Sequence, residues 1–339
     1  MSNECGADLS LVDGPGGAPE VGAFRHVSNS TAMRFPTTLV VTAALLAPSA
    51  ATAQLESTLP KTTTLPASAR AMALGDSYAM TSGHADALFY HPARLTSAQG
   101  FGGSLQRWGA ASSAAAFSAA FDFLGGTWGV GLRALQFSVP DGSVFLAPTG
   151  QDHLFDPGGD PVSERTATIG YGRELFAGVS LGVAVDLLDT RVQSSLNNVM
   201  LFDAGLATDL GPVGIGLTAH DIGGKPWSDY GSRPSRIVLG AGTYGRQAGI
   251  FDLGFAANAG LDADDDLTYG GGVEVGYYPI QGRTFVARIG FQDVPDGSET
   301  SPLTTGFAFW ADDLSIEWAF RPVSGGEEGG THRFGVRWR

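Results

Sequence analysis

Residues 179–187, VSLGVAVDL, carry an apolar side chain at every odd-numbered position and a Ser, Gly, Ala or Asp at every position between. A period of two is typical of a β-strand with one apolar face. The pattern returns along the chain down to the last strand, where Phe334, Val336 and Trp338 alternate with Arg333, Gly335 and Arg337. Apolar outer faces and small or charged inner faces, repeated in this way, favour a closed barrel in lipid over a soluble core.

The alternation predicts an all-β fold, a closed antiparallel transmembrane β-barrel of about 14 strands. Most of the predicted strands have about ten residues, the length that a tilted strand needs to cross the hydrocarbon layer. The predicted strands are 101–109, 113–123, 127–138, 164–174, 178–189, 199–210, 213–221, 235–244, 250–259, 267–278, 283–292, 303–310, 313–321 and 331–339.

Charged residues within these strands fall on the inner register, which places them in the lumen. A basic residue on the lipid face costs about 2–4 kcal/mol at the midplane, whereas a polar lumen lets it pair or hydrate. The predicted lumen-facing charges are Asp122, Arg133, Asp186, Asp203, Asp252, Glu274, Arg288, Glu317 and Arg321. The many glycines on the same register suggest that another part of the chain packs closely against the wall.

The connections between the predicted strands alternate in length. Short ones such as 124–126 and 211–212 alternate with long polar ones such as 139–163 and 222–234. Bacterial outer-membrane barrels have short periplasmic turns and long outer loops, and an even strand number puts both barrel ends in the periplasm.

Residues 33–53, MRFPTTLVVTAALLAPSAATA, have the form of a secretory signal peptide. A basic Arg34 precedes a short apolar run, and Ala51-Thr52-Ala53 forms a small-residue cleavage site. The apolar run is shorter than the ~20 residues of a spanning helix. Residues 1–32, which contain the only cysteine, Cys5, are expected to be a mis-annotated or disordered extension, so disulfides and thiolate sites are excluded from the mature chain.

Residues 54–100 lack the alternation and precede the barrel of residues 101–339. Short helical or turn-rich pieces are expected near 67–80 and 85–95. We expect this segment to lie in the lumen as a plug; a periplasmic tail is the alternative.

Residues 66–98 resemble the N-terminal block of the FadL-like outer-membrane proteins, specifically their PorV/PorQ branch. The C-terminal residues GGTHRFGVRWR also resemble the closing strand of that branch. Leu74, Ser77 and His91 depart from the pattern, His91 taking the place of a usual Asn. The residues that match are Arg70, Gly75, Ala79, Asp86, Ala87, Pro92, Ala93 and Leu95.

The resemblance implies a monomeric barrel with its N-terminus inside and without a cofactor. It also implies one of two activities: passage of hydrophobic molecules, or an accessory role in type IX protein secretion. The leading prediction is a transport or secretion-accessory role in the outer membrane of a Gram-negative-type bacterium. The alternatives are a channel for uptake of hydrophobic small molecules and a structural or adhesive surface barrel.

The expected partners follow from this location: outer-membrane lipid, the barrel-assembly machinery, and secreted proteins or hydrophobic small molecules. A net charge of −14 argues against nucleic acid.

Enzyme and metal sites have weak support in the sequence. His220 precedes Asp221 and could join a serine in a hydrolase triad, but a polar pair at a strand end is the plainer interpretation. Asp262–Asp266 spaces carboxylates like a calcium loop, yet Leu267 stands where an EF-hand needs glycine. We therefore expect a non-enzymatic protein without a metal site.

Overall fold

The computed structural model describes residues 61–339 apart from 79, 81–82, 109–111, 140–159, 177, 193–194, 224–234, 244, 263–265, 295–297, 299 and 324–329. The predicted extension, the signal peptide and the first residues of the predicted plug, 54–60, lie outside the described residues. Two parts of the described chain differ in character: an N-terminal segment, residues 61–99, and a sheet that follows it. We call residues 61–99 the inner segment.

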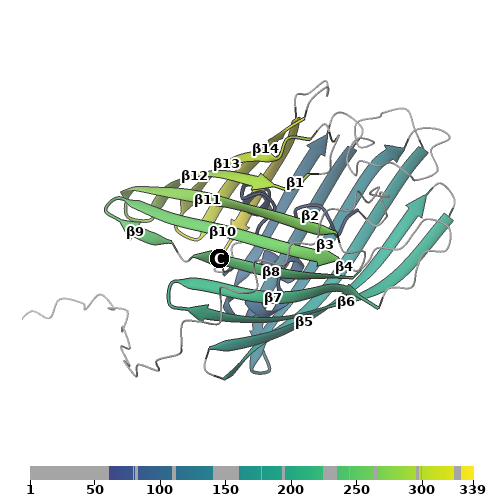
Figure 1. Cartoon of the computed structure of the whole chain (residues 1–339), viewed down its shortest axis with the longest axis horizontal. Helices are drawn as coiled ribbons and strands as arrows, with labels where there is room; N and C mark the ends of the chain where they lie inside the picture. Colours follow the sequence, from purple (N-terminus) through teal and green to yellow (C-terminus); the bar gives the residue numbers. More distant parts are fainter. Residues whose placement is uncertain are drawn as a thin grey trace, which may run out of the picture. The chain divides into compact units, whose positions relative to one another are not determined.

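In the part of the chain that the structure describes, fifteen strands form one antiparallel sheet that closes on itself (Figure 1). Each strand pairs with the next along the chain, except that β8 and β9 both pair with β10; β1 pairs with β15, so the sheet has the topology of a closed barrel. The strands are β1 (Gly100–Trp108), β2 (Ser112–Phe123), β3 (Gly126–Val139), β4 (Asp160–Phe176), β5 (Val179–Val192), β6 (Ser195–Leu210), β7 (Val213–Ile222), β8 (Arg236–Thr243), β9 (Arg246–Ala248), β10 (Phe251–Asp262), β11 (Leu267–Ile280), β12 (Arg283–Gln292), β13 (Leu303–Ala311), β14 (Leu314–Pro322) and β15 (Gly330–Trp338).

The prediction of a barrel of about 14 strands is confirmed, because β9 continues β8 rather than crossing the wall again. Both strands pair with β10, β8 with its second half and β9 with its first residues. The predicted strand 235–244 covers β8 and ends before β9.

Several strands extend beyond the predicted ends on the side of the long connections. β4 begins at Asp160 and β6 at Ser195, four residues earlier than predicted in each case. These extensions continue the pairing of β4 with β3 and of β6 with β5.

The short connections are tight turns whose backbone suits the twist of the strands. Leu124 and Gly125 between β2 and β3 have φ of 52° and 73°. Two successive left-handed residues are the requirement of a type I′ hairpin turn.

The two faces of the sheet differ as the alternation predicts. Along β12 the side chains alternate strictly between exposed and buried from Arg283 to Gly290. Exposed large apolar side chains cover the outward face, for example Phe117, Leu132, Ile289 and Phe307. The inward face carries buried small and charged residues.

Helical structure in the described chain is confined to the inner segment. It contains α1 (Ala69–Ala73) and two 3-10 helices, η2 (Ala85–Phe89) and η3 (Pro92–Ser97). None of the described helices has the length and apolar character of a membrane span.

Candidate functional site

The inner segment contacts the inward face of the barrel along its whole length. Its first described residues lie near the start of β4, where the carboxylate of Glu164 accepts hydrogen bonds from the backbone N–H of Lys61 (3.0 Å) and of Thr62 (2.6 Å). In η3, beside the turn between β6 and β7, Arg94 Nη1 lies 2.7 Å from Asp209 Oδ1. Glu164 is fully buried, so these hydrogen bonds compensate its carboxylate and the two N–H groups for the water that they lose on burial.

Local signals in the sequence explain the short helices. Ser68 precedes α1, and its hydroxyl accepts a hydrogen bond from the N–H of Ala71 at 3.3 Å. Gly75 follows α1 with φ of 69°, which turns the chain away. Pro92 occupies the first position of η3, where its missing N–H costs nothing.

Inward-facing glycines on most of the strands form the seat of the inner segment, and we call them the belt glycines. At most of these positions a Cβ would come closer than 3.0 Å to the inner segment, so glycine permits the approach; at Gly335 a Cβ would make an ordinary contact of 3.4 Å. The belt glycines are Gly129, Gly131, Gly170, Gly172, Gly182, Gly205, Gly216, Gly240, Gly270, Gly272, Gly290, Gly306 and Gly335.

Several matched residues of the N-terminal motif lie against this belt, whereas the matched Ala79 lies outside the described residues. The side chain of Leu95 packs over Gly129 and Gly172, and the backbone of Pro92 and Ala93 packs over Gly182. Gly75 approaches the backbone of β12, and its N–H donates to Thr304 Oγ1 at 3.2 Å. Four of the eight matched residues thus make close contacts with the wall.

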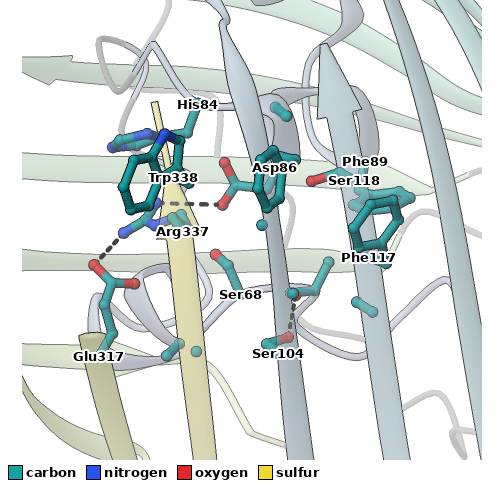
Figure 2. Close-up of a pocket in the computed structure, with 18 of the residues that line it drawn as sticks. Ser68, His84, Asp86, Phe89, Ser104, Phe117, Ser118, Glu317, Arg337 and Trp338 are labelled. Carbon is teal, nitrogen blue, oxygen red and sulfur yellow. Dashed lines mark hydrogen bonds and ion pairs between the residues drawn. The ribbon is translucent and has the colours of Figure 1, made fainter. Parts of the chain in front are cut away.

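Six buried charges of alternating sign connect the inner segment to β11, β12, β14 and β15. Arg70 in α1 lies 2.5 Å from Glu274, and Arg288 bridges Glu274 (3.1 Å) and Glu317 (3.2 Å). Arg337 pairs with Glu317 and lies 3.8 Å from Asp86 in η2. Figure 2 shows Arg337 between Glu317 and Asp86. Arg70 and Asp86, the two ends of this ion-pair chain, both belong to the inner segment. The ion pairs therefore attach the inner segment to the wall at two points.

A second polar cluster lies on the inward faces of β3 and β5–β8. Arg133 lies 3.6 Å from Asp186, and His220 Nδ1 lies 2.9 Å from Asp203 Oδ2. The partner of His220 is therefore Asp203 on the neighbouring strand. The adjacent Asp221 instead donates its N–H to the same Asp203 carboxylate at 2.9 Å. The His220–Asp221 pair considered from the sequence does not form.

The remaining predicted lumen-facing charges have separate partners. Asp122 lies exposed at the end of β2 and accepts from Thr127, and Asp252 accepts from the Tyr278 hydroxyl at 3.0 Å. Arg321 donates to Gln292. Phe334, Val336 and Trp338 point outward and are about half exposed on β15, which closes the sheet against β1.

Two titratable residues of the inner segment lie in unusual surroundings. Burial lowers the pKa of His91 to about 3, with His220 and Arg94 acting in the same direction. Its imidazole packs over Gly205 and Gly216, and neither ring nitrogen has a hydrogen-bond partner among the described residues. Burial raises the pKa of Asp76 to about 6, although Arg321, Arg236 and Arg333 oppose the shift.

Two small cavities lie between the described residues of the inner segment and the wall. A cavity of about 20 Å³ lies against β15, β1 and β2, and Ala69, Phe89, Ala116 and Asp86 are among its lining residues (Figure 2). A second cavity, of about 60 Å³, is lined by residues that include Asp76, Tyr78, His91 and Arg236. A cavity that binds benzene in a protein core has about 150 Å³. Neither cavity therefore admits an aromatic ring without movement.

Sequence reasoning missed several residues that fix the inner segment. Glu164 binds the first described residues of the segment, Arg94 pairs with Asp209, and Arg337 completes the ion-pair chain. The fully buried Arg333 donates to Gln106 at 2.7 Å and to Ser104 at 2.6 Å. The inward register of β4 and β15 could have indicated Glu164, Arg333 and Arg337.

Among the described residues, no three His, Asp or Glu side chains are arranged to hold a metal ion. The Asp262 carboxylate accepts the N–H of Asp266 at 2.9 Å, as in a capped turn; residues 263–265 of the considered calcium loop lie outside the described part.

Comparisons with known proteins give likeness at the level of structure alone. No protein-family model and no curated protein sequence matches the chain. A deletion mutant of the TodX monoaromatic hydrocarbon channel superposes with a TM-score of 0.50 at 12% identity, over 79% of this chain and 96% of that one. The Pseudomonas putida toluene transporter TodX gives 0.49 at 14% identity (79% and 95%), and a FadL homologue of Pseudomonas aeruginosa gives 0.48 at 10% (84% and 96%). The chain thus shares the barrel fold of the TodX hydrocarbon channel.

Proposed function

We propose that this protein is an outer-membrane channel for hydrophobic small molecules, and that the inner segment closes its lumen. The single observation behind the proposal is the seat of the inner segment: it packs against the belt glycines, and the two cavities between it and the wall, of about 20 and 60 Å³, are too small for an aromatic ring. The fold that the chain shares with a monoaromatic hydrocarbon channel suggests that the substrates are hydrophobic small molecules. Transport then requires the inner segment to move.

The outward face supports the membrane location. Exposed Phe, Leu, Ile and Val side chains alternate with buried residues on strand after strand. A soluble protein rarely exposes contiguous apolar patches larger than a few hundred Å².

The secretion role implied by the PorV/PorQ resemblance stays a prediction. A secreted protein would be bound by the outer loops, and the longest of these, residues 140–159 and 224–234, lie outside the described residues.

A removable cross-link tests the channel directly. A Cβ placed on Gly335 would lie 3.4 Å from the Cβ of Ala69, close to the Cβ–Cβ distance of roughly 3.5–4.5 Å in a disulfide. The variant Ala69→Cys/Gly335→Cys, with Cys5→Ser, should therefore lock the inner segment to β15 under oxidising conditions. The two single-cysteine variants are the matched controls.

The measurement is uptake of radiolabelled toluene by cells of a host that lacks such a channel and has an intact outer membrane. We expect the unmodified protein to raise uptake over an empty vector. The oxidised double variant should fall to the empty-vector level and recover when a reductant is added. Uptake that persists in the locked form would show that the inner segment need not move, and no gain for the unmodified protein would rule out the channel.

A further inference from the structure

The larger of the two cavities between the inner segment and the wall is surrounded by polar groups that lack partners. It lies against the inward faces of β3, β7, β8 and β10. Five of its lining residues have a buried polar atom without a hydrogen-bond partner among the described residues. They are Thr63, Asp76 and His91 of the inner segment and Arg133 and Arg236 of the wall. Buried polar groups in folded proteins nearly always have a partner, so five such groups around one cavity point to an occupant.

His91 gives the clearest indication of what this occupant offers. Only 3% of the residue is exposed, and neither ring nitrogen has a partner among the described residues. Because burial holds its pKa at about 3, the ring is neutral at neutral pH. In a neutral imidazole one nitrogen donates and the other accepts. The occupant must therefore supply both an acceptor and a donor to this one side chain.

The other four groups narrow the chemistry further. The Nε–H groups of Arg133 and Arg236 can only donate, the carboxylate oxygen of Asp76 accepts, and the hydroxyl of Thr63 does both. Both guanidinium groups already pair with a carboxylate of the wall, so neither requires an anion. An anion would also be repelled by Asp76, and a metal cation by the two arginines. A neutral occupant that donates and accepts fits all five groups.

The size of the cavity selects water within that class. Its volume is about 60 Å³. A single water molecule needs roughly 10–15 Å³ measured in the same way, together with two to four polar partners. The cavity therefore has room for a small cluster of water molecules, and its lining has partners for them.

We propose that this cavity is a binding site for a cluster of ordered water molecules, which bridges the inner segment to the wall at β3 and β8. The waters bind Thr63, Asp76 and His91 on one side and the two arginine Nε–H groups on the other. Hydrogen bonds through ordered water are nearly as favourable in enthalpy as direct ones. The inner segment is then held by ion pairs against β11–β15 and by water against β3 and β8. This proposal does not depend on transport.

Two methionines of the inner segment allow a direct test. Met80 lines the cavity and is 2% exposed, whereas Met72 is 1% exposed and lines neither cavity. Short X-ray pulses produce hydroxyl radicals from water in place, and a radical formed beside a methionine converts it to the sulfoxide. The purified full-length protein in a neutral detergent is irradiated, and mass spectrometry of its peptides follows both residues. We expect Met80 to be oxidised several times faster than Met72. Equal rates would overturn the proposal.

A pair of threonine variants tests the hydrogen bonds of the water cluster. The hydroxyls of Thr63 and Thr166 are both buried without a partner among the described residues, but Thr166, on β4, lines neither cavity. Valine has nearly the shape of threonine and lacks the hydroxyl. Thr63→Val should lower the unfolding midpoint in guanidinium, because a hydrogen bond to water is lost. Thr166→Val should leave the midpoint unchanged or raise it, because it removes a hydroxyl that has no partner.

The sign of the Thr63→Val shift distinguishes a wet cavity from a dry one. In a dry cavity the substitution removes an uncompensated hydroxyl, so an unchanged or higher midpoint would overturn the proposal. So would a fall equal to that of Thr166→Val, which would be a loss common to buried threonines. Uptake of toluene is not part of either test, so failure of this proposal and failure of the channel are separate results.

Discussion

At the scale of single residues, Gly182 on β5 illustrates how closely the inner segment approaches the wall. A Cβ at this position would overlap the backbone of Pro92 and Ala93, which has no flexible side chain to move aside. Gly182→Ala should therefore destabilise the protein by about 1–3 kcal/mol, the usual cost of overpacking. The measurement is the unfolding midpoint in guanidinium, together with protease sensitivity of the inner segment.

Gly103→Ala is the matched control for this substitution. Gly103 lies on the outward face of β1, and a Cβ there would make an ordinary contact of 3.4 Å with the Ala116 carbonyl. It should change the midpoint little. A Gly182→Ala protein as stable and protease-resistant as the control would show that the segment has room to shift.

The carboxyl group of Asp76 gives the inner segment a pH-dependent stability. Because burial raises its pKa to about 6 from an ordinary value of 3.8, the folded state binds this proton more tightly than the unfolded state. Its contribution to stability is present below pH 3.8 and is lost as the pH rises through 6. Asp76→Asn should therefore stabilise the protein at pH 8 and have little effect at pH 4.

Backbone strain should not obscure the comparison, because Asp76 has φ of 57° and Asn tolerates the left-handed region well. Thermal unfolding at the two pH values measures the effect. An equal shift at pH 4 and pH 8 would indicate that the gain comes from packing rather than from the proton.

At the scale of elements, the ion-pair chain from Arg70 to Asp86 joins α1 and η2 to four strands. Removing one member leaves its buried partner with one counter-charge fewer, which typically lowers the free energy of unfolding by about 3–5 kcal/mol. Arg70→Met should show a loss of this size, since Glu274 then keeps only Arg288. Arg70→Met/Glu274→Gln should recover part of it. A double-mutant cycle in guanidinium gives the coupling, and additive losses would mean that the two side chains do not interact.

The sequence predicts strands far better than it predicts the contacts between elements. The period of two around Val183 is local, so it locates β5 within a few residues. The inward glycines indicate a close approach, but they do not say that Leu95 covers Gly129. The partner of His220 depends on the register between β6 and β7, which places Asp203 beside it. The ion-pair chain through Arg288 and Arg337 depends on the register between five strands and on the path of the inner segment. No local sequence pattern carries that information.

At the scale of the whole molecule, the outward apolar band should behave as a surface immersed in lipid, with a cost for charge that depends on depth. Leu206 lies on the outward face well inside β6, and Leu210 lies on the same face at its end, beside the turn; both are about half exposed or more. Leu206→Lys should destabilise the barrel by about 2–4 kcal/mol and Leu210→Lys by at most about 1 kcal/mol. Equilibrium folding from urea into lipid vesicles measures both. The same strand, face and substitution are compared, so depth is the variable; equal losses for the two variants would show that no hydrocarbon layer surrounds this band.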